Sequence, residues 1–261
     1  MIKVCATGND FLVIDQLNAS DQKISLSKDQ IALACHRHDG FGADGLVFLS
    51  PHPDLAFAWH FFNSDGGEAE MCGNAARAVS QYFAHTRKQS EFSFLTRIGE
   101  IKALVEDPAS LSGTVQVTLP KWKDYERKMD SPVGPFSFVN TGVPHAVLTV
   151  ESLLDLESLR SKALSIKSLP QFQKEGVNVT FKAGSGQPDR IHSVTFERGV
   201  ENFTLSCGTG ALASAICEKD GAGLFDLIVQ VPGGMLIVKA KDNQIDLKGE
   251  GRIIGTCNLG L

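Results

Sequence analysis

The sequence lacks the features of a membrane, secreted or nucleic-acid-binding protein. No run of about 18 apolar residues is present to span a bilayer. The N-terminal residues have no basic start, apolar stretch or small-residue cleavage site of a signal peptide. The formal net charge is -5, so no basic excess favours nucleic acid. We therefore expect a cytoplasmic protein that binds neither nucleic acid nor a membrane.

Cysteine is sparse for a chain of this length. Six cysteines are scattered over 261 residues, whereas secreted disulfide scaffolds are short and dense in cysteine. They form no Cys-x-x-Cys pair, and no histidine lies at metal-ligand spacing from such a pair. We expect reduced thiols and no metal.

A glycine motif typical of dinucleotide-binding proteins is present, but the predicted elements around it are in the wrong order. Residues 40–45 satisfy G-x-G-x-x-G, but they follow a predicted helix and precede a predicted strand. The dinucleotide fingerprint needs the reverse order, a strand, a turn and then a helix. This segment therefore predicts a turn and no bound nucleotide.

Short strands dominate what the sequence does contain. Apolar runs of strand length, bounded by turn residues, predict strands at 11–15, 45–50, 57–62, 92–96, 101–106, 114–120, 137–141, 145–150, 177–183, 191–197, 227–232, 235–240 and 244–249. Helices are predicted at 27–38, 72–86 and 208–221, with a Ser27 cap and with Gly221 as a C-cap.

Two similar α+β domains follow from this order. The charged, proline-containing segment 120–135 is interpreted as a linker, which sets a boundary near residue 116. Each half contains a strand, a polar loop, a Cys-Gly turn and an Ala-rich helix, as expected of a duplicated domain. We predict domains at 1–115 and 116–251, with a C-terminal strand, 252–261, that returns to the first.

The repeated Cys-Gly helix start carries the chemistry. It appears as "MCGNAARA" at 71–78 and as "SCGTGALASA" at 206–215. A helix N-terminus binds carboxylates and favours thiolate over thiol. If the two starts face each other across a cleft, the α-carbon of a bound amino acid lies between two sulfurs. One sulfur then removes the α-proton and the other delivers a proton to the opposite face.

Several motifs in one order resemble the diaminopimelate epimerase family over nearly the whole chain. They are "TGNDFLVID" (7–15), "HRHDGFGADGLVFL" (36–49), "FFNSDGGEAEMCGNAARA" (61–78), "NTGVPHAVL" (140–148), "GVNVTF" (176–181), "FERGVENFTLSCGTGALASA" (196–215) and "VPGGMLIV" (231–238). The resemblance implies an isomerase without a cofactor, which interconverts LL- and meso-diaminopimelate for lysine and peptidoglycan synthesis. It also implies a homodimer, in which each domain wraps a mainly antiparallel sheet around a central helix and the active site lies between the domains.

The resemblance also implies roles for individual residues. Cys72 and Cys207 match the catalytic cysteines, and the backbone N–H groups near them would hold the reacting carboxylate: Gly73, Asn74, Gly208 and Thr209. Other matches bind the rest of the substrate, with Arg198 on its distal carboxylate: Asn9, Asn63, Asn178, Glu197 and Arg198. Glu197 and His145 would bias which sulfur carries the proton.

The sequence departs from the family at positions that affect specificity. Val143 replaces an asparagine of the usual "GNPH", and Gly45 replaces a larger polar residue. A usual glycine is Ala75 here, and the loop before Cys207 is one residue longer. The alternative is therefore a cofactor-independent racemase of another amino acid. A non-catalytic binder of a small acid ranks third, and a cysteine hydrolase last, because hydrolysis gives no reason for a second matched cysteine.

Overall fold

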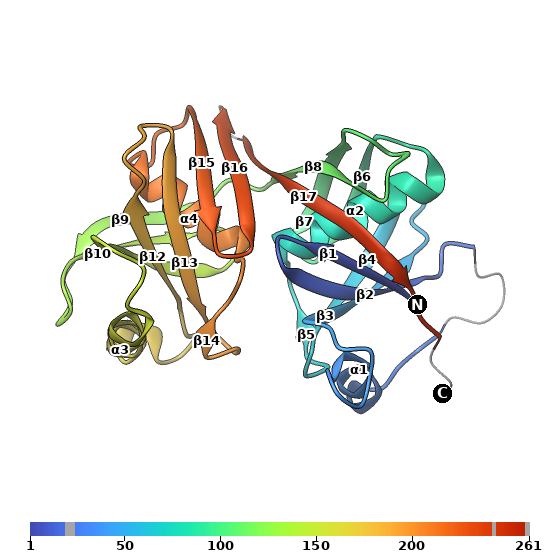
Figure 1. Cartoon of the computed structure of the whole chain (residues 1–261), viewed down its shortest axis with the longest axis horizontal. Helices are drawn as coiled ribbons and strands as arrows, with labels where there is room; N and C mark the ends of the chain where they lie inside the picture. Colours follow the sequence, from blue (N-terminus) through green and yellow to red (C-terminus); the bar gives the residue numbers. More distant parts are fainter. Residues whose placement is uncertain (19–23, 242–243, 259–261) are drawn as a thin grey trace. The chain divides into compact units, whose positions relative to one another are not determined.

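The chain forms two compact units in the computed structural model, which describes residues 1–18, 24–241 and 244–258 (Figure 1). The first unit contains 1–118 and 248–261, and the second contains 119–247. The domain limits from the sequence remain predictions, and residues 259–261 of the predicted C-terminal strand lie outside the described residues. Among the described residues, no helix is long and apolar enough to cross a membrane.

The first unit is built on eight strands that close into a ring. Neighbouring strands pair in the order β1, β2, β3, β4, β6, β7, β8 and β17, and β17 pairs back onto β1. The pairs β2–β3 and β4–β6 are parallel, and the others given by register are antiparallel. The elements are β1 (Ile2–Ala6), β2 (Asn9–Asp15), α1 (Lys28–Cys35), β3 (Gly45–Ser50), β4 (Phe57–Asn63), β5 (Glu68–Ala69), α2 (Gly73–Arg87), β6 (Glu91–Thr96), β7 (Gly99–Val105), β8 (Ser112–Leu119) and β17 (Gln244–Thr256).

The second unit repeats this pairing pattern. Its strands pair in the order β9, β10, β11, β12, β13, β15 and β16, with β11–β12 and β13–β15 parallel. The elements are β9 (Lys123–Met129), β10 (Phe136–Asn140), β11 (Pro144–Thr149), α3 (Leu156–Lys167), a 3-10 turn η1 (Pro170–Phe172), β12 (Asn178–Gly184), β13 (Arg190–Glu197), β14 (Asn202–Phe203), α4 (Gly208–Glu218), β15 (Phe225–Val231) and β16 (Gly234–Lys241).

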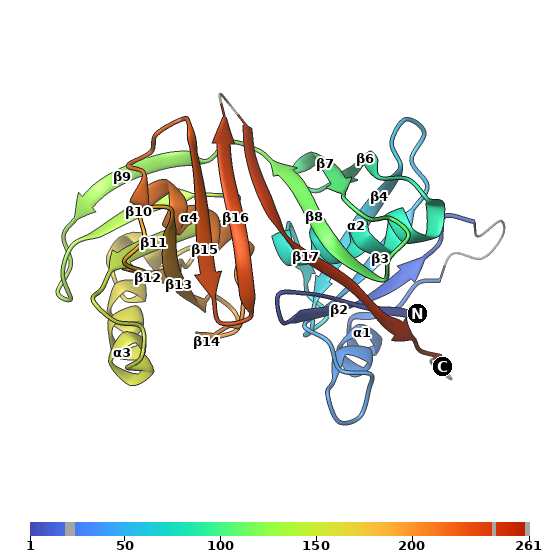
Figure 2. The same ribbon diagram turned by 45° about the horizontal axis from the view of Figure 1, so that its top comes forward.

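The duplication expected from the sequence is therefore visible in the strand order. In each unit a two-residue strand, β5 or β14, pairs with the end of a long strand and leads into a cysteine. The helix that follows, α2 or α4, packs against the sheet of its own unit. Figure 2 shows α2 behind β8 and β17. The α+β fold with two similar halves is confirmed.

Helix α2 is buried on all sides. Every residue from Gly73 to Ala84 is buried. Five of these twelve residues are alanine or glycine, and these let the backbone approach the surrounding strands closely. A Cβ at Gly251 of β17 would lie 2.7 Å from the Arg77 carbonyl oxygen, so this glycine is required for the contact.

The second half differs from the sequence prediction in three respects. The predicted linker, 120–135, contains β9, which pairs antiparallel with β10. Charged side chains are common on such edge strands because they oppose pairing with other molecules. Helix α3 was not predicted, although three residues at helical spacing bury one face in the core: Leu159, Ala163 and Ile166. Helix α4 ends at Glu218, before the predicted cap Gly221, because Asp220 adopts the left-handed conformation (φ 57°).

Candidate active site

Both candidate catalytic cysteines are N-caps of buried helices. The backbone of Cys72 is extended (φ -140°, ψ 115°), and its sulfur accepts the N–H of Ala75 at 3.5 Å. Cys207 has the same conformation (φ -120°, ψ 108°), and its sulfur accepts the N–H of Gly210 at 3.3 Å. Donors at the positive end of a helix stabilise a sulfur anion. Each unit therefore presents one sulfur that is suited to carry negative charge.

Asparagine side chains surround Cys72, and we call this group the Cys72 cluster: Cys72, Gly73, Asn74 and Asn9. Asn74 Nδ2 donates to Asn9 Oδ1 at 3.1 Å. The Cys72 S–H donates to the same oxygen across 4.0 Å. The cluster joins the start of β2 to the start of α2, so two predicted substrate-binding asparagines lie beside the sulfur. Asn63 is exposed at the end of β4, opposite Gly45 of β3.

Two charged residues that the sequence analysis did not identify support this cluster. Asp44 Oδ2 accepts a hydrogen bond from Asn9 Nδ2. At the other end, Arg77 donates to Asn74 Oδ1 at 2.8 Å. The available signal for Arg77 was its charge, since it is the only charged residue between Gly73 and Ala84.

A second group, the Cys207 cluster, consists of Cys207, Gly208, Thr209, His145 and Asn178. The Thr209 hydroxyl lies 3.4 Å from the Cys207 sulfur and 3.0 Å from Nε2 of His145. Asn178 Nδ2 is 3.4 Å from the same imidazole nitrogen. Burial, and then the charge of Arg198, lowers the pKa of His145 to about 3. The imidazole is therefore neutral at physiological pH.

Threonines behind the imidazole hold it in place. His145 Nδ1 lies 2.9 Å from Oγ1 of Thr180, which in turn lies 3.0 Å from Oγ1 of Thr195. Both hydroxyls come from the central strands β12 and β13. All three side chains are buried, so the network satisfies polar groups that water does not reach. The sequence analysis missed these threonines because alternating threonines are common in ordinary strands.

Glu197 is the last residue of β13, and Arg198 follows it directly. The Arg198 N–H donates to Asn178 Oδ1 at 2.7 Å, and its guanidinium donates to the carbonyl of Glu175. Gly176 (φ 71°) makes room for this side chain, since a Cβ there would lie 2.7 Å from Arg198 Cδ. Glu197 is half-buried and accepts a hydrogen bond from the Thr204 hydroxyl.

Two departures from the family motif have a clear local basis. A Cβ at Gly45 would lie 2.6 Å from the Phe62 carbonyl oxygen, so any side chain there requires a backbone shift. Ala75 is fully buried in α2. At the equivalent place in α4, a Cβ on Gly210 would lie 2.2 Å from the Thr195 hydroxyl. The two helix starts therefore differ in how closely they approach their strands.

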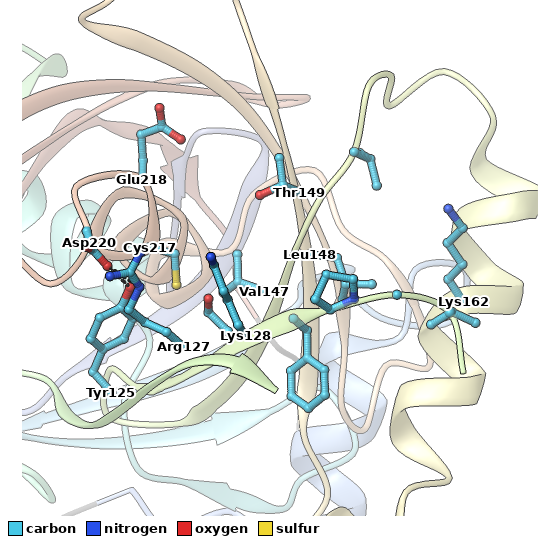
Figure 3. A pocket seen from close by; sticks show the side chains of 16 residues that line it. Tyr125, Arg127, Lys128, Val147, Leu148, Thr149, Lys162, Cys217, Glu218 and Asp220 are labelled. Carbon is cyan, nitrogen blue, oxygen red and sulfur yellow. Dashed lines mark hydrogen bonds and ion pairs between the residues drawn. The ribbon is translucent and has the colours of Figure 1, made fainter. Parts of the chain in front are cut away.

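The pocket in Figure 3 is separate from these clusters. Its volume is about 390 Å³, and its labelled side chains come from β9, β11, α3 and the end of α4. Arg127 and Asp220 form an ion pair of 2.6 Å there, and Tyr125 also donates to Asp220. Among the described residues that line it, none is a predicted site residue. We assign it no function.

Comparison with known proteins identifies the family of the chain. The family model described as Diaminopimelate epimerase matches residues 1–122 and 137–252. A curated diaminopimelate epimerase from a Nitratiruptor species is 34% identical over 252 residues, which cover 95% of this chain and 94% of that protein. One from Helicobacter pylori is 33% identical over 272 residues, covering 99% and 96%. The internal segment between the two matched ranges, 123–136, contains β9.

Solved structures share the fold at low sequence identity. A probable proline racemase from Agrobacterium radiobacter has a TM-score of 0.75 at 16% identity, with 100% of this chain and 92% of that chain covered. A hydroxyproline epimerase from Agrobacterium vitis has a TM-score of 0.70 at 17% identity, covering 97% and 90%. The fold, the cysteine-capped helices and the relatives together define an isomerase of the racemase and epimerase class. Within this class, the chain belongs to the diaminopimelate epimerase family.

Proposed function

We propose that this protein is a diaminopimelate epimerase, which interconverts LL- and meso-diaminopimelate by proton transfer at one α-carbon. The observation that carries the proposal is the matched pair of cysteine N-caps, each accepting an N–H bond from its own helix. One thiolate takes the α-hydrogen as a proton and leaves a carbanion. The other thiol gives its proton to the opposite face of that carbon. The two sulfurs have then exchanged protonation states, and the reverse reaction uses them in exchanged roles.

The carbanion is stabilised where its charge collects, on the adjacent carboxylate. In the proposed complex, backbone N–H groups at the two helix starts hold that carboxylate: Gly73, Asn74, Gly208 and Thr209. Fixed donors of this kind stabilise developing negative charge without having to reorganise. The residues needed for this step belong to the protein itself, so the proposed reaction uses no cofactor and no metal.

The remaining site residues bind the rest of the substrate in this proposal. Arg198 pairs with the distal carboxylate, which suits the bidentate geometry of a guanidinium. The asparagines complete the binding: Asn9, Asn63 and Asn178. His145 and Glu197 bias the protonation of the thiols, and the contact from His145 through Thr209 to Cys207 supports the first of these roles.

A racemase of another amino acid is the second candidate. Val143 supports it because an apolar residue stands where the family motif has an asparagine. Gly45 supports it because the close approach of Phe62 leaves no room for the usual larger side chain without a backbone shift. Both changes remove a polar side chain that the family motif has, and both cysteines remain in place.

The biological setting follows from the proposed product. Meso-diaminopimelate would feed lysine synthesis and peptidoglycan crosslinking. We propose that the enzyme acts in the cytoplasm as a homodimer. Sedimentation of the purified protein tests the dimer.

Proton NMR in heavy water tests the reaction directly. The reduced enzyme is incubated with LL-diaminopimelate and, separately, with a panel of single amino acids. We expect the α-hydrogen signal to be lost with diaminopimelate alone, together with formation of the meso isomer. Exchange with a different amino acid would favour the second candidate. Absence of exchange with every compound would overturn both.

A further inference from the structure

Arg77 is a fully buried arginine in helix α2, one turn after Cys72. It makes four hydrogen bonds within the described part of the chain, and none goes to a carboxylate. Their acceptors are Thr7 Oγ1 at 2.8 Å, Asn74 Oδ1 at 2.8 Å, and the carbonyls of Gly73 at 3.2 Å and Glu250 at 3.4 Å. A buried cation is costly unless nearby groups compensate its charge.

The hydrogen bonds of Arg77 fix the orientation of two asparagines. A guanidinium only donates, so Asn74 must present Oδ1 to it and turn Nδ2 toward Asn9. Asn9 then accepts through Oδ1 and donates through Nδ2 to Asp44, whose carboxylate only accepts. This series of hydrogen bonds runs from the Arg77 cation to the Asp44 anion. Each amide has one orientation that satisfies both of its neighbours, and Asn9 Oδ1 consequently faces the Cys72 sulfur.

The charge of Arg77 also acts on that sulfur. Burial lowers the pKa of Arg77 to about 10, and the negative charges of Cys72 and Glu250 oppose this shift. The guanidinium therefore stays charged at neutral pH. Because the interaction between two charges is mutual, the cation that a Cys72 thiolate stabilises also stabilises that thiolate.

Other charged groups near the cluster are already paired. Asp44 Oδ1 is 2.7 Å from the Arg37 guanidinium, which also binds Asp10 at 2.8 Å. Lys3 lies 2.8 Å from Asp10 as well. These ions compensate one another, and Arg37 and Asp44 are also screened by solvent. Arg77 is the charged side chain that is both fully buried and bonded to the cluster.

We propose that Arg77 is a positioning residue that orients Asn74 and Asn9 beside Cys72 and brings a buried positive charge to the same helix start. The proposal rests on the proposed function only in assigning a reaction to that sulfur. The effect on the Cys72 thiol is a property of the free protein and is measured without substrate.

A purely structural role is the competing explanation, since Arg77 also joins α2 to the Glu250 carbonyl of β17. Gln81 provides a matched control on the same helix. It is fully buried and joins α2 to the carbonyls of Asp107 and Ser110 at 3.2 Å and 2.8 Å. It makes no hydrogen bond with the Cys72 cluster among the described residues. Losing it therefore removes a buried polar tie and leaves the cluster's bonds in place.

The experiment compares Arg77→Met, Arg77→Lys and Gln81→Met. The pH at half-maximal alkylation of Cys72 is measured with iodoacetamide, and the Cys72 peptide is quantified by mass spectrometry. Turnover of LL-diaminopimelate is measured in parallel. In R77M the alkylation midpoint should rise by about 1 pH unit. In R77K it should stay near the wild-type value, because the charge remains.

Turnover separates charge from orientation. Lysine has one nitrogen where arginine uses three to bond Asn74 with Thr7, Gly73 and Glu250, so R77K should lose about 100-fold in kcat. Q81M should keep the alkylation midpoint and most of kcat, even if its melting temperature falls. Wild-type kcat in R77K would overturn the orienting role. If R77M does not fold, the kcat of R77K still tests that role. An unchanged midpoint in folded R77M would overturn the role of the charge.

Failure of the proposed function gives a different result. If no variant and not even the wild type turns over diaminopimelate, the substrate assignment fails. If the alkylation midpoint of Cys72 still depends on Arg77 in that case, the proposed effect of Arg77 on the sulfur stands.

Discussion

His145 Nε2 lies 3.0 Å from the hydroxyl of Thr209, and that hydroxyl lies 3.4 Å from the sulfur of Cys207. A buried imidazole thus reaches a helix-capping cysteine through a single side chain. Because burial keeps the imidazole neutral, it acts on this hydroxyl as a hydrogen-bond partner and not as a charge. The relationship has consequences for stability as well as for the proposed chemistry.

The first prediction concerns acid stability. The pKa of His145 is about 3 in the folded chain against an ordinary 6.5, so the unfolded chain binds the proton more readily between these values. Stability therefore rises with pH across this window, and it is lost as pH falls below 6.5. At about pH 5 this titration lowers the free energy of unfolding by about 2 kcal/mol relative to neutral pH.

Urea unfolding at about pH 7.5 and about pH 5 measures this loss. His145→Gln keeps a polar side chain without the titration, so its stability should fall less between the two conditions. His192→Gln, at an exposed position of β13, is the control and should resemble the wild type. Equal pH dependence in the wild type and H145Q would contradict the prediction.

The second prediction concerns the thiols. Cys72→Ala and Cys207→Ala should each lower kcat by at least about 100-fold, because each removes one partner in proton transfer. Cys35→Ala is the control: this cysteine is the buried last residue of α1, and burial raises the pKa of its thiol to about 12. C35A should keep wild-type turnover when it is folded. Full activity in C72A or C207A would exclude the two-base mechanism.

The third prediction concerns the packing at the start of α4. Gly210→Ala places a Cβ 2.2 Å from the Thr195 hydroxyl, which forces the helix start to move. We expect a loss of about 1–3 kcal/mol in unfolding free energy and a lower kcat. Thr195→Ala in the same chain removes the clash and should recover part of both. Thermal unfolding and turnover of the single and double variants measure this, and purely additive losses would count against it.

The fourth prediction concerns Arg198. Arg198→Lys should raise KM for diaminopimelate by about tenfold or more while changing kcat less, because a bidentate contact is lost. Gly176→Ala should act in the same direction by displacing the Arg198 side chain. Gly186→Ala introduces similar backbone strain (φ 80°) where nothing lies within 4 Å of the new Cβ. Steady-state kinetics should show normal KM in G186A; a rise there equal to that in G176A would assign the effect to strain.

Much of the fold could be predicted from local pattern. Apolar runs identified the long strands because buried strands need such residues, and the Ser27 cap of α1 forms the expected capping box. The edge strand β9 was missed because its charged side chains resemble a linker, and its pairing depends on β10. Helix α3 was missed despite an Asp155 cap and helical spacing of its buried residues, so that signal was present and not used.

The sequence by itself determined the two helix starts. A cysteine followed by glycine and a run of small residues caps a helix through local hydrogen bonds, so no distant residue is needed to place the sulfur at the positive end. Only the tertiary structure decided which side chains reach each sulfur. Asn9, Asp44 and Arg77 meet because the register of β2 and β3 and the burial of α2 bring them together. His145, Thr180 and Thr209 likewise meet through the pairing of β11 with β12 and the packing of α4 on those strands, which depends on contacts between residues far apart in the chain.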